Sequence, residues 1–204
     1  MMSRTEQHSL WMFILLVLIF AVPLLSAWWL VANHQLGMSL TERGQLIRPP
    51  LSINNLQLMN SKQQPINQQQ LKGKWLVMYF NPSNICGSQC QTNLYKLQQI
   101  YSASGNDKSR LQRALLVFTS PKTPTADLTP LLQQQFNGTV ELLTSTSSFK
   151  QFVSHLPNMR ASMAEGGFYV VDPLGNVIMS YPSTTDAQGI FKDVKQLLKV
   201  SQIG

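Results

Sequence analysis

The sequence contains two cysteines, Cys86 and Cys90, and both lie in one short segment. Two thiols at this spacing can form a local disulfide, or as thiolates they can clamp a soft cation such as Cu(I). Zinc is disfavoured, because a structural zinc site needs four ligands and the chain has no second Cys or His pair. The alternative is that two small apolar side chains are simply buried here. We favour a functional pair, since the chain has no other cysteine.

The hydrophobic pattern predicts the elements on either side of the cysteines. Residues 75–80 form a continuous apolar run that ends just before Pro82, which is typical of a strand buried on both faces. Residues 89–101 carry apolar side chains at a helical period. The cysteines therefore lie where a helix begins, and its partial positive charge and free N–H groups favour thiolate. The spacing puts both sulfurs on one helical face.

This placement predicts different roles for the two thiols. Cys86 is expected at or before the first helical turn, where the free N–H groups act, and is the more reactive thiol. Cys90 is expected one turn further in and more buried, as the resolving partner. Equally slow reactions of both thiols would instead favour a purely structural pair.

The rest of the chain alternates predicted strands and helices. Residues 168–171 and 177–181 flank the turn residues 172–176 and predict an antiparallel hairpin, in which Asp172 caps local N–H groups. Further strands are expected at 114–119 and 140–143, and helices at 127–136, 147–155 and 187–200. An additional hairpin is expected from residues 52–58 and 64–66. This order fits an α/β, thioredoxin-like sandwich with a central mixed sheet flanked by helices, but it also fits other small α/β folds. The position of the cysteines, just after a buried strand and at the start of a helix, favours the thioredoxin-like sandwich.

The residues around the cysteines resemble a known family. The segment from Tyr79 to Leu97, the Cys-x3-Cys spacing and the later run of residues 167–176 are similar to the Sco-type proteins of cytochrome c oxidase assembly. The resemblance implies one membrane anchor and a thioredoxin-like domain outside the cytoplasmic membrane. It also implies that Cys86 and Cys90 bind copper for delivery to the binuclear copper centre of the oxidase, or reduce the cysteines of that centre.

The sequence departs from the family pattern at the copper site. The family carries Pro and Asp between its cysteines and Pro after the second, whereas this chain has Gly87, Ser88, Gln89 and Gln91. The family's copper-ligand His corresponds to Ala164, and the preceding family Asp corresponds to Met163. His155 and Met159 are the nearby alternatives. The dithiol is therefore the part of the site that this chain keeps, with Cu(I) as its expected ligand.

The N-terminal part predicts a membrane anchor. Residues 10–32 contain no charged residue, and at 1.5 Å per residue they span about 30 Å of hydrocarbon. A cleaved signal peptide is the competing interpretation, but the apolar run is too long and no small-x-small site follows it directly. We therefore expect a tail at 1–9, a transmembrane helix at 10–32, a linker at 33–50 that ends in Arg-Pro-Pro, and the thioredoxin-like domain at 51–204.

The composition and motifs of the chain exclude several classes of binding partner and enzyme. The 204 residues carry a net charge of +7, but the 16 Lys and Arg are scattered and no basic run or basic helix face is present, so nucleic acid is not expected as a partner. The sequence also lacks phosphate-binding glycine motifs, a metalloprotease motif and a serine-hydrolase motif. The expected partners are the membrane and a respiratory oxidase subunit or another assembly factor.

Three functions remain, in order of preference. The first is an anchored oxidase assembly factor in a bacterial inner membrane, with its N-terminus in the cytoplasm and its domain in the periplasm, acting as thiol reductant or transient Cu(I) holder. The second is a non-catalytic interaction module in respiratory complex biogenesis. The third is a general thiol–disulfide oxidoreductase, which is disfavoured because that chemistry usually uses a Cys-x-x-Cys spacing.

Overall fold

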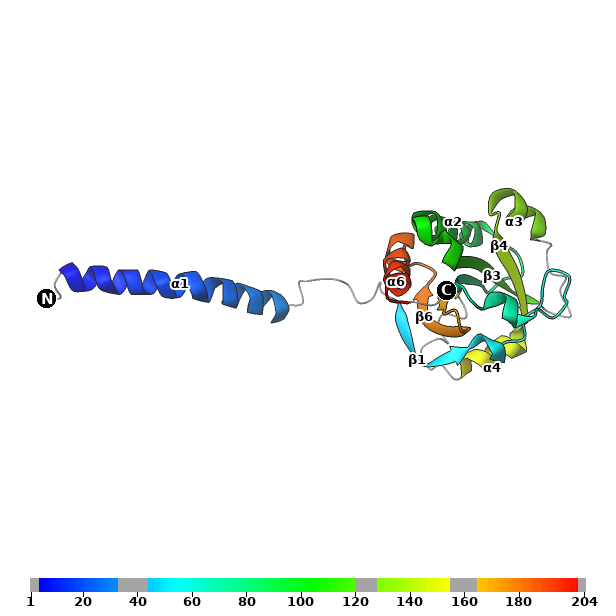
Figure 1. The fold of residues 1–204 in the computed structure, drawn as a ribbon, viewed down its shortest axis with the longest axis horizontal. Helices are drawn as coiled ribbons and strands as arrows, with labels where there is room; N and C mark the ends of the chain where they lie inside the picture. Colours follow the sequence, from blue (N-terminus) through cyan, green and yellow to red (C-terminus); the bar gives the residue numbers. More distant parts are fainter. Residues whose placement is uncertain (1–3, 33–43, 120–127, 155–164, 202–204) are drawn as a thin grey trace. The chain divides into compact units, whose positions relative to one another are not determined.

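The computed structural model describes residues 4–32, 44–119, 128–154 and 165–201 (Figure 1). The chain divides into two compact units, Met1–Leu40 and Thr41–Gly204. The first holds one helix, α1 (Arg4–Ala32), and the second holds a sheet with helices on both faces. Each unit is described by itself.

The second unit is built on a six-stranded sheet with the order β1-β6-β5-β2-β3-β4. Strands β2, β3 and β4 run parallel to one another, with β4 at one edge of the sheet. On the other side of β2, the pairs β2–β5, β5–β6 and β6–β1 are antiparallel. The strands are β1 (Gln45–Ser52), β2 (Trp75–Asn81), β3 (Leu111–Thr119), β4 (Thr139–Ser145), β5 (Gly167–Val171) and β6 (Asn176–Pro182). The helices are α2 (Ser88–Ala103), α3 (Thr129–Gln135), α4 (Thr146–Ser154) and α6 (Ala187–Val200), with short 3-10 turns at Ile53–Asn55, Gln68–Leu71 and Gly105–Arg110. This arrangement confirms the predicted thioredoxin-like mixed sheet.

The sheet separates two apolar cores, because alternate residues of each strand point to opposite faces. On β2, Trp75, Val77 and Tyr79 pack into one core with apolar residues of α2, α3 and α6. The intervening Leu76 and Phe80 pack into the other core, where the Phe80 and Phe149 rings stack with centroids 4.3 Å apart. Figure 1 shows α2 and α6 on one side of the sheet and α4 on the other. Both faces of the sheet are therefore covered.

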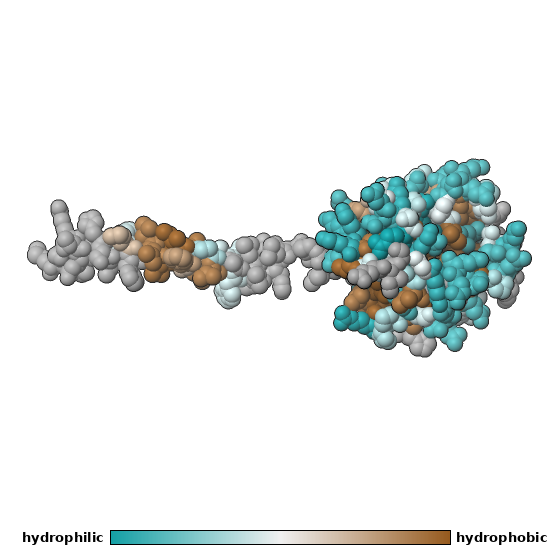
Figure 2. All heavy atoms as spheres, in the orientation of Figure 1, coloured by the Kyte–Doolittle hydropathy of each residue, from teal (hydrophilic) through white to brown (hydrophobic). Residues whose placement is uncertain are grey.

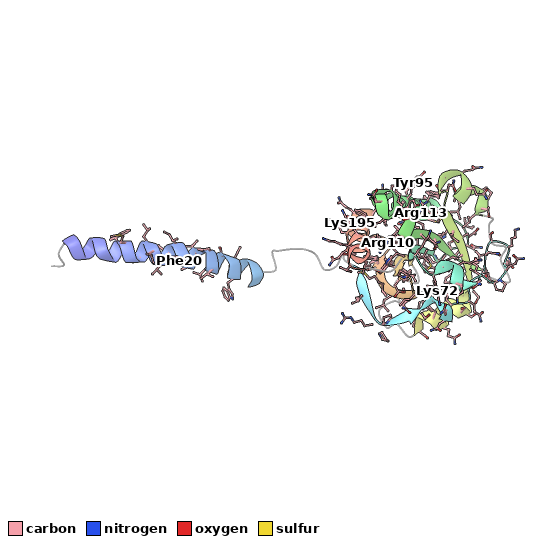
Figure 3. All side chains as sticks on the ribbon, viewed as in Figure 1. Phe20, Lys72, Tyr95, Arg110, Arg113 and Lys195 are labelled. Carbon is pink, nitrogen blue, oxygen red and sulfur yellow. A yellow bond between two sulfur atoms is a disulfide. The ribbon has the colours of Figure 1, made fainter. Side chains whose placement is uncertain are left out.

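Two arginines, Arg110 directly before β3 and Arg113 within it, hold the helices of the first core (Figure 3). Arg110 donates from its two terminal nitrogens to the Leu198 and Ser201 carbonyl oxygens, at 3.0 and 2.9 Å, at the carboxyl end of α6. Cationic groups stabilise this end of a helix, because its last carbonyls lack helical partners. Arg113 lies 4.3 Å from the centre of the Tyr101 ring of α2 and donates to the Asn137 carbonyl at 2.7 Å.

The hydrophobic pattern located most elements of this unit within a few residues. Helix α6 has the predicted bounds, and α2 begins one residue before the predicted start. Every strand predicted from residue 75 onward is present. Residue 127, where the third helix was expected to start, and residue 155, where the fourth was expected to end, lie outside the described residues.

The predictions for residues 45–66 are wrong in two respects. The expected linker at 33–50 does not extend to Pro50, because Gln45–Ser52 forms the edge strand β1, antiparallel to β6. Proline is compatible with an edge strand, where its missing N–H costs no ladder bond, and the pairing is irregular between Leu46 and Leu51. In place of the expected hairpin at 52–58 and 64–66, the chain forms a 3-10 turn and two isolated bridges, from Met59 to Pro65 and from Met59 to Leu143. Residues 33–43 of the linker lie outside the described residues.

Helix α1 is apolar along much of its length (Figure 2). Its exposed side chains include Trp11, Phe20 and Trp28, and Pro23 lies inside the helix. Among the described residues, no helix combines the length and the apolarity required to cross a membrane. The transmembrane helix at 10–32 therefore stays a prediction.

The turn between β5 and β6 depends on Asp172, and this yields a stability prediction. One carboxylate oxygen accepts from the Leu174 and Asn176 backbone N–H groups at 3.0 and 2.7 Å, and the other accepts from the Asn176 side chain at 3.0 Å. We expect Asp172→Ala to lower the free energy of unfolding by about 1–3 kcal/mol, since hydrogen bonds to charged groups are lost. Denaturant unfolding measures the change.

Asp172→Asn is the matched control for this turn. It keeps an oxygen that can accept from the two backbone N–H groups, without the charge, and it loses the bond from the Asn176 side chain, whose donor would face a second donor. We expect less than half of the loss seen with alanine. An equal loss for both variants would mean that charge, and not the turn geometry, stabilises the hairpin.

Candidate active site at the start of helix α2

Cys86 and Cys90 form a disulfide, with their Cα atoms 5.1 Å apart. Cys86 lies in the loop after β2, two residues before α2 begins at Ser88, and Cys90 lies in the first turn of the helix. The prediction that both sulfurs share one helical face is therefore wrong, because Cys86 is not helical. The expected order along the chain is present, since Cys86 precedes the helix and is 8% exposed, while Cys90 is 3% exposed. Their different reactivities stay a prediction.

The first turn of α2 has no side-chain cap. Gly87 is the N-cap residue, and the first turn carries no acidic side chain. The first N–H groups of a helix have no partner within the helix, and an uncapped end leaves them available to an anion. When the disulfide is reduced, the Cys86 thiolate is the nearest anion along the chain to these groups. The helix end therefore favours ionisation of this thiol.

Asn81, the last residue of β2, organises the loop that carries Cys86. Its side-chain nitrogen donates to the Ser83 and Ile85 carbonyls at 2.9 and 3.1 Å, and the Ser83 hydroxyl accepts from the Ile85 N–H at 3.2 Å. Ile85 itself is 62% exposed, directly before Cys86 in the chain. The loop thus presents an apolar side chain to solvent beside a well-buried disulfide.

Gly166 brings the start of β5 against the end of β2. Its φ of +77° lies in the region that favours glycine. A Cβ at this position would lie 2.6 Å from the Phe80 carbonyl oxygen and 3.3 Å from the Tyr79 hydroxyl. Phe168 follows on β5, and its ring packs 5.1 Å from the Tyr79 ring in the same core as both cysteines. Sequence reasoning missed this close approach, although the Gly166-Gly167 pair was its signal.

Two polar side chains of α2 extend the site beyond the predicted residues. Asn93 is fully buried, and it lowers the pKa of Tyr79 against the larger effect of burial, which raises it. Lys96 is partly buried; burial lowers its pKa, and the charge of Asp186 opposes that shift. The Lys96 ammonium donates to the Ser183 carbonyl at 2.7 Å. Asn93 could have been noticed from the sequence as an amide within the apolar face of the predicted helix.

The described residues contain the two sulfurs but no complete metal site. No group of three His, Cys, Asp or Glu residues that could hold a metal ion occurs in the part of the chain that the structure describes. The positions expected to decide on a third copper ligand, namely His155, Met159, Met163 and Ala164, lie outside the described residues. In reduced form the pair provides two soft donors, which suit a two-coordinate Cu(I) ion.

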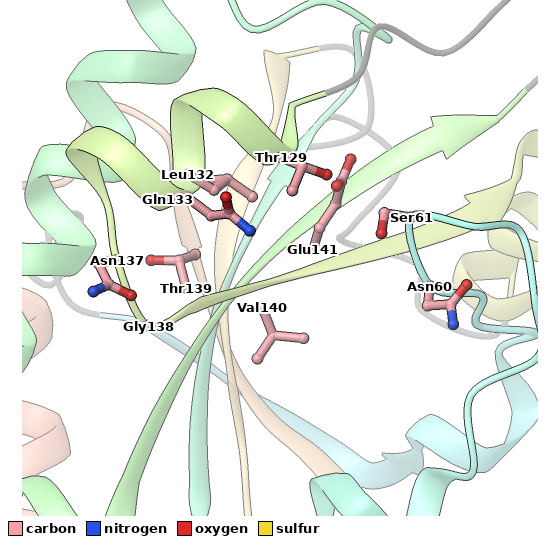
Figure 4. Close-up of a pocket in the computed structure, with 10 residues that line it drawn as sticks. All are labelled: Asn60, Ser61, Thr129, Leu132, Gln133, Asn137, Gly138, Thr139, Val140 and Glu141. Carbon is pink, nitrogen blue, oxygen red and sulfur yellow. The ribbon is translucent and has the colours of Figure 1, made fainter.

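A separate pocket of about 330 Å³ lies between α3, the start of β4 and the loop at Asn60 (Figure 4). Its lining is largely polar and includes Gln133, Asn137 and Thr139. It opens near the amino end of β4, whereas the cysteines follow the carboxyl end of the parallel strand β2. The pocket is therefore not part of the disulfide site.

A thioredoxin-like sandwich with a disulfide at the start of α2, the helix that follows β2, defines a thioredoxin-fold protein with a cysteine-pair site. Over residues 75–201 the chain matches the family described as "Transmembrane-like, thioredoxin-like, C-terminal domain", and it belongs to that family. The matched region runs from the start of β2 to the end of α6 and contains both cysteines. No curated protein sequence matches the chain.

Solved structures of Sco proteins are similar to this chain. Copper-bound ScoI of Arabidopsis thaliana has 14% identity and a TM-score of 0.55, with 74% of this chain and 98% of that chain covered. Copper-bound Sco1 of yeast has 17% identity and a TM-score of 0.56, with 78% and 94% covered. BsSco, described with a disulfide switch, has 17% identity and a TM-score of 0.52, with 77% and 100% covered. The predicted resemblance to Sco-type proteins is thus confirmed in the fold.

The uncapped helix end yields a prediction for Cys86. In reduced protein with Cys90→Ser, we expect Gly87→Asp to slow alkylation of Cys86 by about threefold or more. The new carboxylate would accept from the first-turn N–H groups and would add a negative charge beside the thiol. The pH dependence of the alkylation rate should show a raised Cys86 pKa.

Gly87→Ala is the control for this substitution. The position has an ordinary extended conformation, and a Cβ there would contact nothing within 4 Å of the described atoms. We expect Cys86 to be alkylated in this variant at nearly the same rate as in the protein that keeps Gly87. If alanine slowed the reaction as much as aspartate, the effect would be steric and the proposed role of the free N–H groups would be wrong.

Proposed function

We propose that this protein is a membrane-anchored, Sco-like factor that assists assembly of the copper centre of cytochrome c oxidase through Cys86 and Cys90. The observation that carries the proposal is the disulfide at the start of α2, on a fold similar to copper-bound Sco proteins. BsSco, another similar structure, is described as a member of the Sco family of cytochrome c oxidase assembly proteins. The partner is an oxidase subunit or another assembly factor.

As a reductant, the dithiol transfers two electrons to a disulfide of its target. The Cys86 thiolate attacks one target sulfur, the target S–S bond breaks, and the other target sulfur leaves as a thiolate that takes up a proton. Cys90, after losing its proton, attacks the Cys86 sulfur of the mixed disulfide and releases the second target thiol. The protein is left with the Cys86–Cys90 disulfide, and a second dithiol must reduce it again.

As a metal carrier, the same dithiol holds copper as cargo. Two thiolates suit Cu(I), whereas Cu(II) prefers tetragonal sites with nitrogen ligands. Ala164 cannot supply the imidazole that the family pattern has at this position. We therefore propose that Cu(I) binds weakly and transiently and that Cu(II) is not retained.

The copper proposal predicts a defined stoichiometry and selectivity. Detergent-solubilised reduced protein, titrated against a competing chelator, should bind one Cu(I) per chain, and binding should be lost in Cys86→Ser with Cys90→Ser. Ala164→His should strengthen binding at least about tenfold, because ligand-set changes commonly have effects of this size. With Cu(II), no thiolate charge-transfer band should appear in the unaltered chain.

Two outcomes would contradict this prediction in different ways. A strong Cu(II)–thiolate band would mean that another residue, with His155 the first to test, completes the site. Absence of Cu(I) binding, together with normal oxidase assembly in cells that carry the double serine variant, would exclude both the metal and the redox role. The non-catalytic interaction module would then be the better function.

We also propose that residues 10–32 anchor the chain in a bacterial inner membrane, with the N-terminus in the cytoplasm and the domain in the periplasm. The uncharged apolar run and the exposed apolar side chains of α1 support an anchor. Alkaline phosphatase fused after Gly204 should be active, since it folds only in an oxidising compartment. A fluorescent reporter that requires the cytoplasm serves as the control, and activity of that fusion alone would reverse the orientation.

A further inference from the structure

Asn93 is a buried polar side chain whose amide makes no hydrogen bond with the described residues. It is 0% exposed, and neither its amide nitrogen nor its amide oxygen has a hydrogen-bond partner in the described part of the chain. It lies on the apolar face of α2, together with Cys90, Leu94 and Leu97. A buried amide that is not hydrogen-bonded destabilises the fold, whereas leucine, which has a similar shape, would not.

The helical spacing places Asn93 beside Cys90. Asn93 follows Cys90 by three residues, so the two side chains are neighbours on the helix surface. Side chains on a helix point back toward its N-terminus, which directs the amide over the turn that contains Cys90. From β2, Tyr79 approaches the same amide without reaching hydrogen-bond geometry, and Tyr79 packs in one core with both cysteines.

The hydrogen-bonding capacity of Cys90 depends on its redox state. A disulfide sulfur is a weak acceptor, but a thiolate is an anionic acceptor and makes stronger, charge-assisted bonds. The amide of Asn93 therefore has no good partner while the disulfide is closed. When the disulfide opens, the Cys90 sulfur at the neighbouring position on the helix becomes a strong acceptor.

We propose that Asn93 is a positioning residue for the reduced state of the site, where its side-chain N–H donates to the Cys90 sulfur. The proposal rests on the redox role proposed above and adds how the redox equilibrium is set. Stabilising the reduced form makes the pair easier to reduce and a stronger oxidant. Asn93 thus raises the reduction potential of the Cys86–Cys90 pair and lowers the pKa of Cys90.

The experiment measures the disulfide equilibrium of the full-length, detergent-solubilised protein with glutathione. Two glutathione thiols give up two electrons and two protons and form glutathione disulfide. The two electrons break the Cys86–Cys90 bond and leave two thiolates, each of which takes up a proton only below its own pKa, while the remaining protons go to the buffer. The equilibrium is measured at a pH where Cys90 stays a thiolate, because Asn93 acts on that form. In Asn93→Leu we expect the equilibrium to favour the protein disulfide by about tenfold, a reduction potential lower by about 30 mV. Asn93→Ala should shift it in the same direction and replaces the leucine variant if that variant does not fold.

Thr144→Val is the matched control. Thr144 is also 0% exposed, and its hydroxyl also lacks a hydrogen-bond partner among the described residues. It lies on β4 next to Leu143, whose side chain packs in the core that contains the cysteines, so Thr144 points to the opposite face of the sheet. We expect this variant to change stability but to leave the reduction potential as it is.

A second measurement assigns the effect to one thiol. In Cys86→Ser, adding Asn93→Leu should raise the pKa of Cys90 by about one unit, which corresponds to the tenfold change above. In Cys90→Ser, the same change should leave the pKa of Cys86 within a few tenths. The ionisable groups that face this part of α2, namely Tyr79, Lys96 and Asp186, are not altered in any variant.

An unchanged potential in both Asn93 variants, or an equal shift in Thr144→Val, would overturn the proposal. A shifted potential with an unchanged Cys90 pKa would also overturn it, because Asn93 would then act through packing alone. None of these measurements uses copper or an oxidase. If the proposed assembly function proved wrong, the experiment on Asn93 could therefore still be interpreted. A negative result for Asn93 would likewise not contradict the assembly function.

Discussion

Burial of β2 on both faces is the constraint on which the site depends. All seven residues of Trp75–Asn81 are buried, and the strand pairs with β3 on one side and with β5 on the other. A strand enclosed in this way cannot change its register without moving apolar side chains out of both cores. Its end is therefore fixed in space. The Asn81 side chain then donates hydrogen bonds to two carbonyls of the following loop, and these bonds fix the position of Cys86 at the end of that loop.

The same enclosure explains which parts of the structure could be predicted. The runs at 75–80 and 114–119 and the hairpin around Asp172 carry their signal in local sequence, so their positions were found. Strand β1 could not be found in this way, because its Arg-Pro-Pro segment has no alternation and is a strand only through pairing with β6. At the site, Cys86 and Cys90 could be predicted from their spacing. The contact of Gly166 with Phe80 could not be predicted in this way, because the two residues are far apart in the chain.

Helices α2 and α6 pack in one core but begin in different ways. The N-cap residue of α6 is Asp186, whose carboxylate accepts from the Gly189 N–H, whereas the N-cap residue of α2 is Gly87, which provides no side-chain cap. A side-chain cap typically stabilises a helix by about 1 kcal/mol. Helix α2 lacks this contribution at the turn that contains Cys90. Its first N–H groups have no side-chain acceptor and can serve a sulfur anion. The missing cap that lowers the stability of the helix is therefore also the feature on which the predicted reactivity of Cys86 depends.

The position of the disulfide within the chain allows it to open without unfolding the domain. It joins residues only four apart, and in the chain-entropy description so short a loop contributes about 2 kcal/mol, against about 4.7 kcal/mol for a loop of 100 residues. The first core, by contrast, joins residues of β2, β5, α2 and α6 that are distant in sequence. We therefore expect reduction to remove a local link and to leave the packing of Tyr79, Leu97 and Phe168 in place. In the role proposed for Asn93, this core holds the amide beside the Cys90 sulfur, so that one side chain is enough to shift the redox equilibrium.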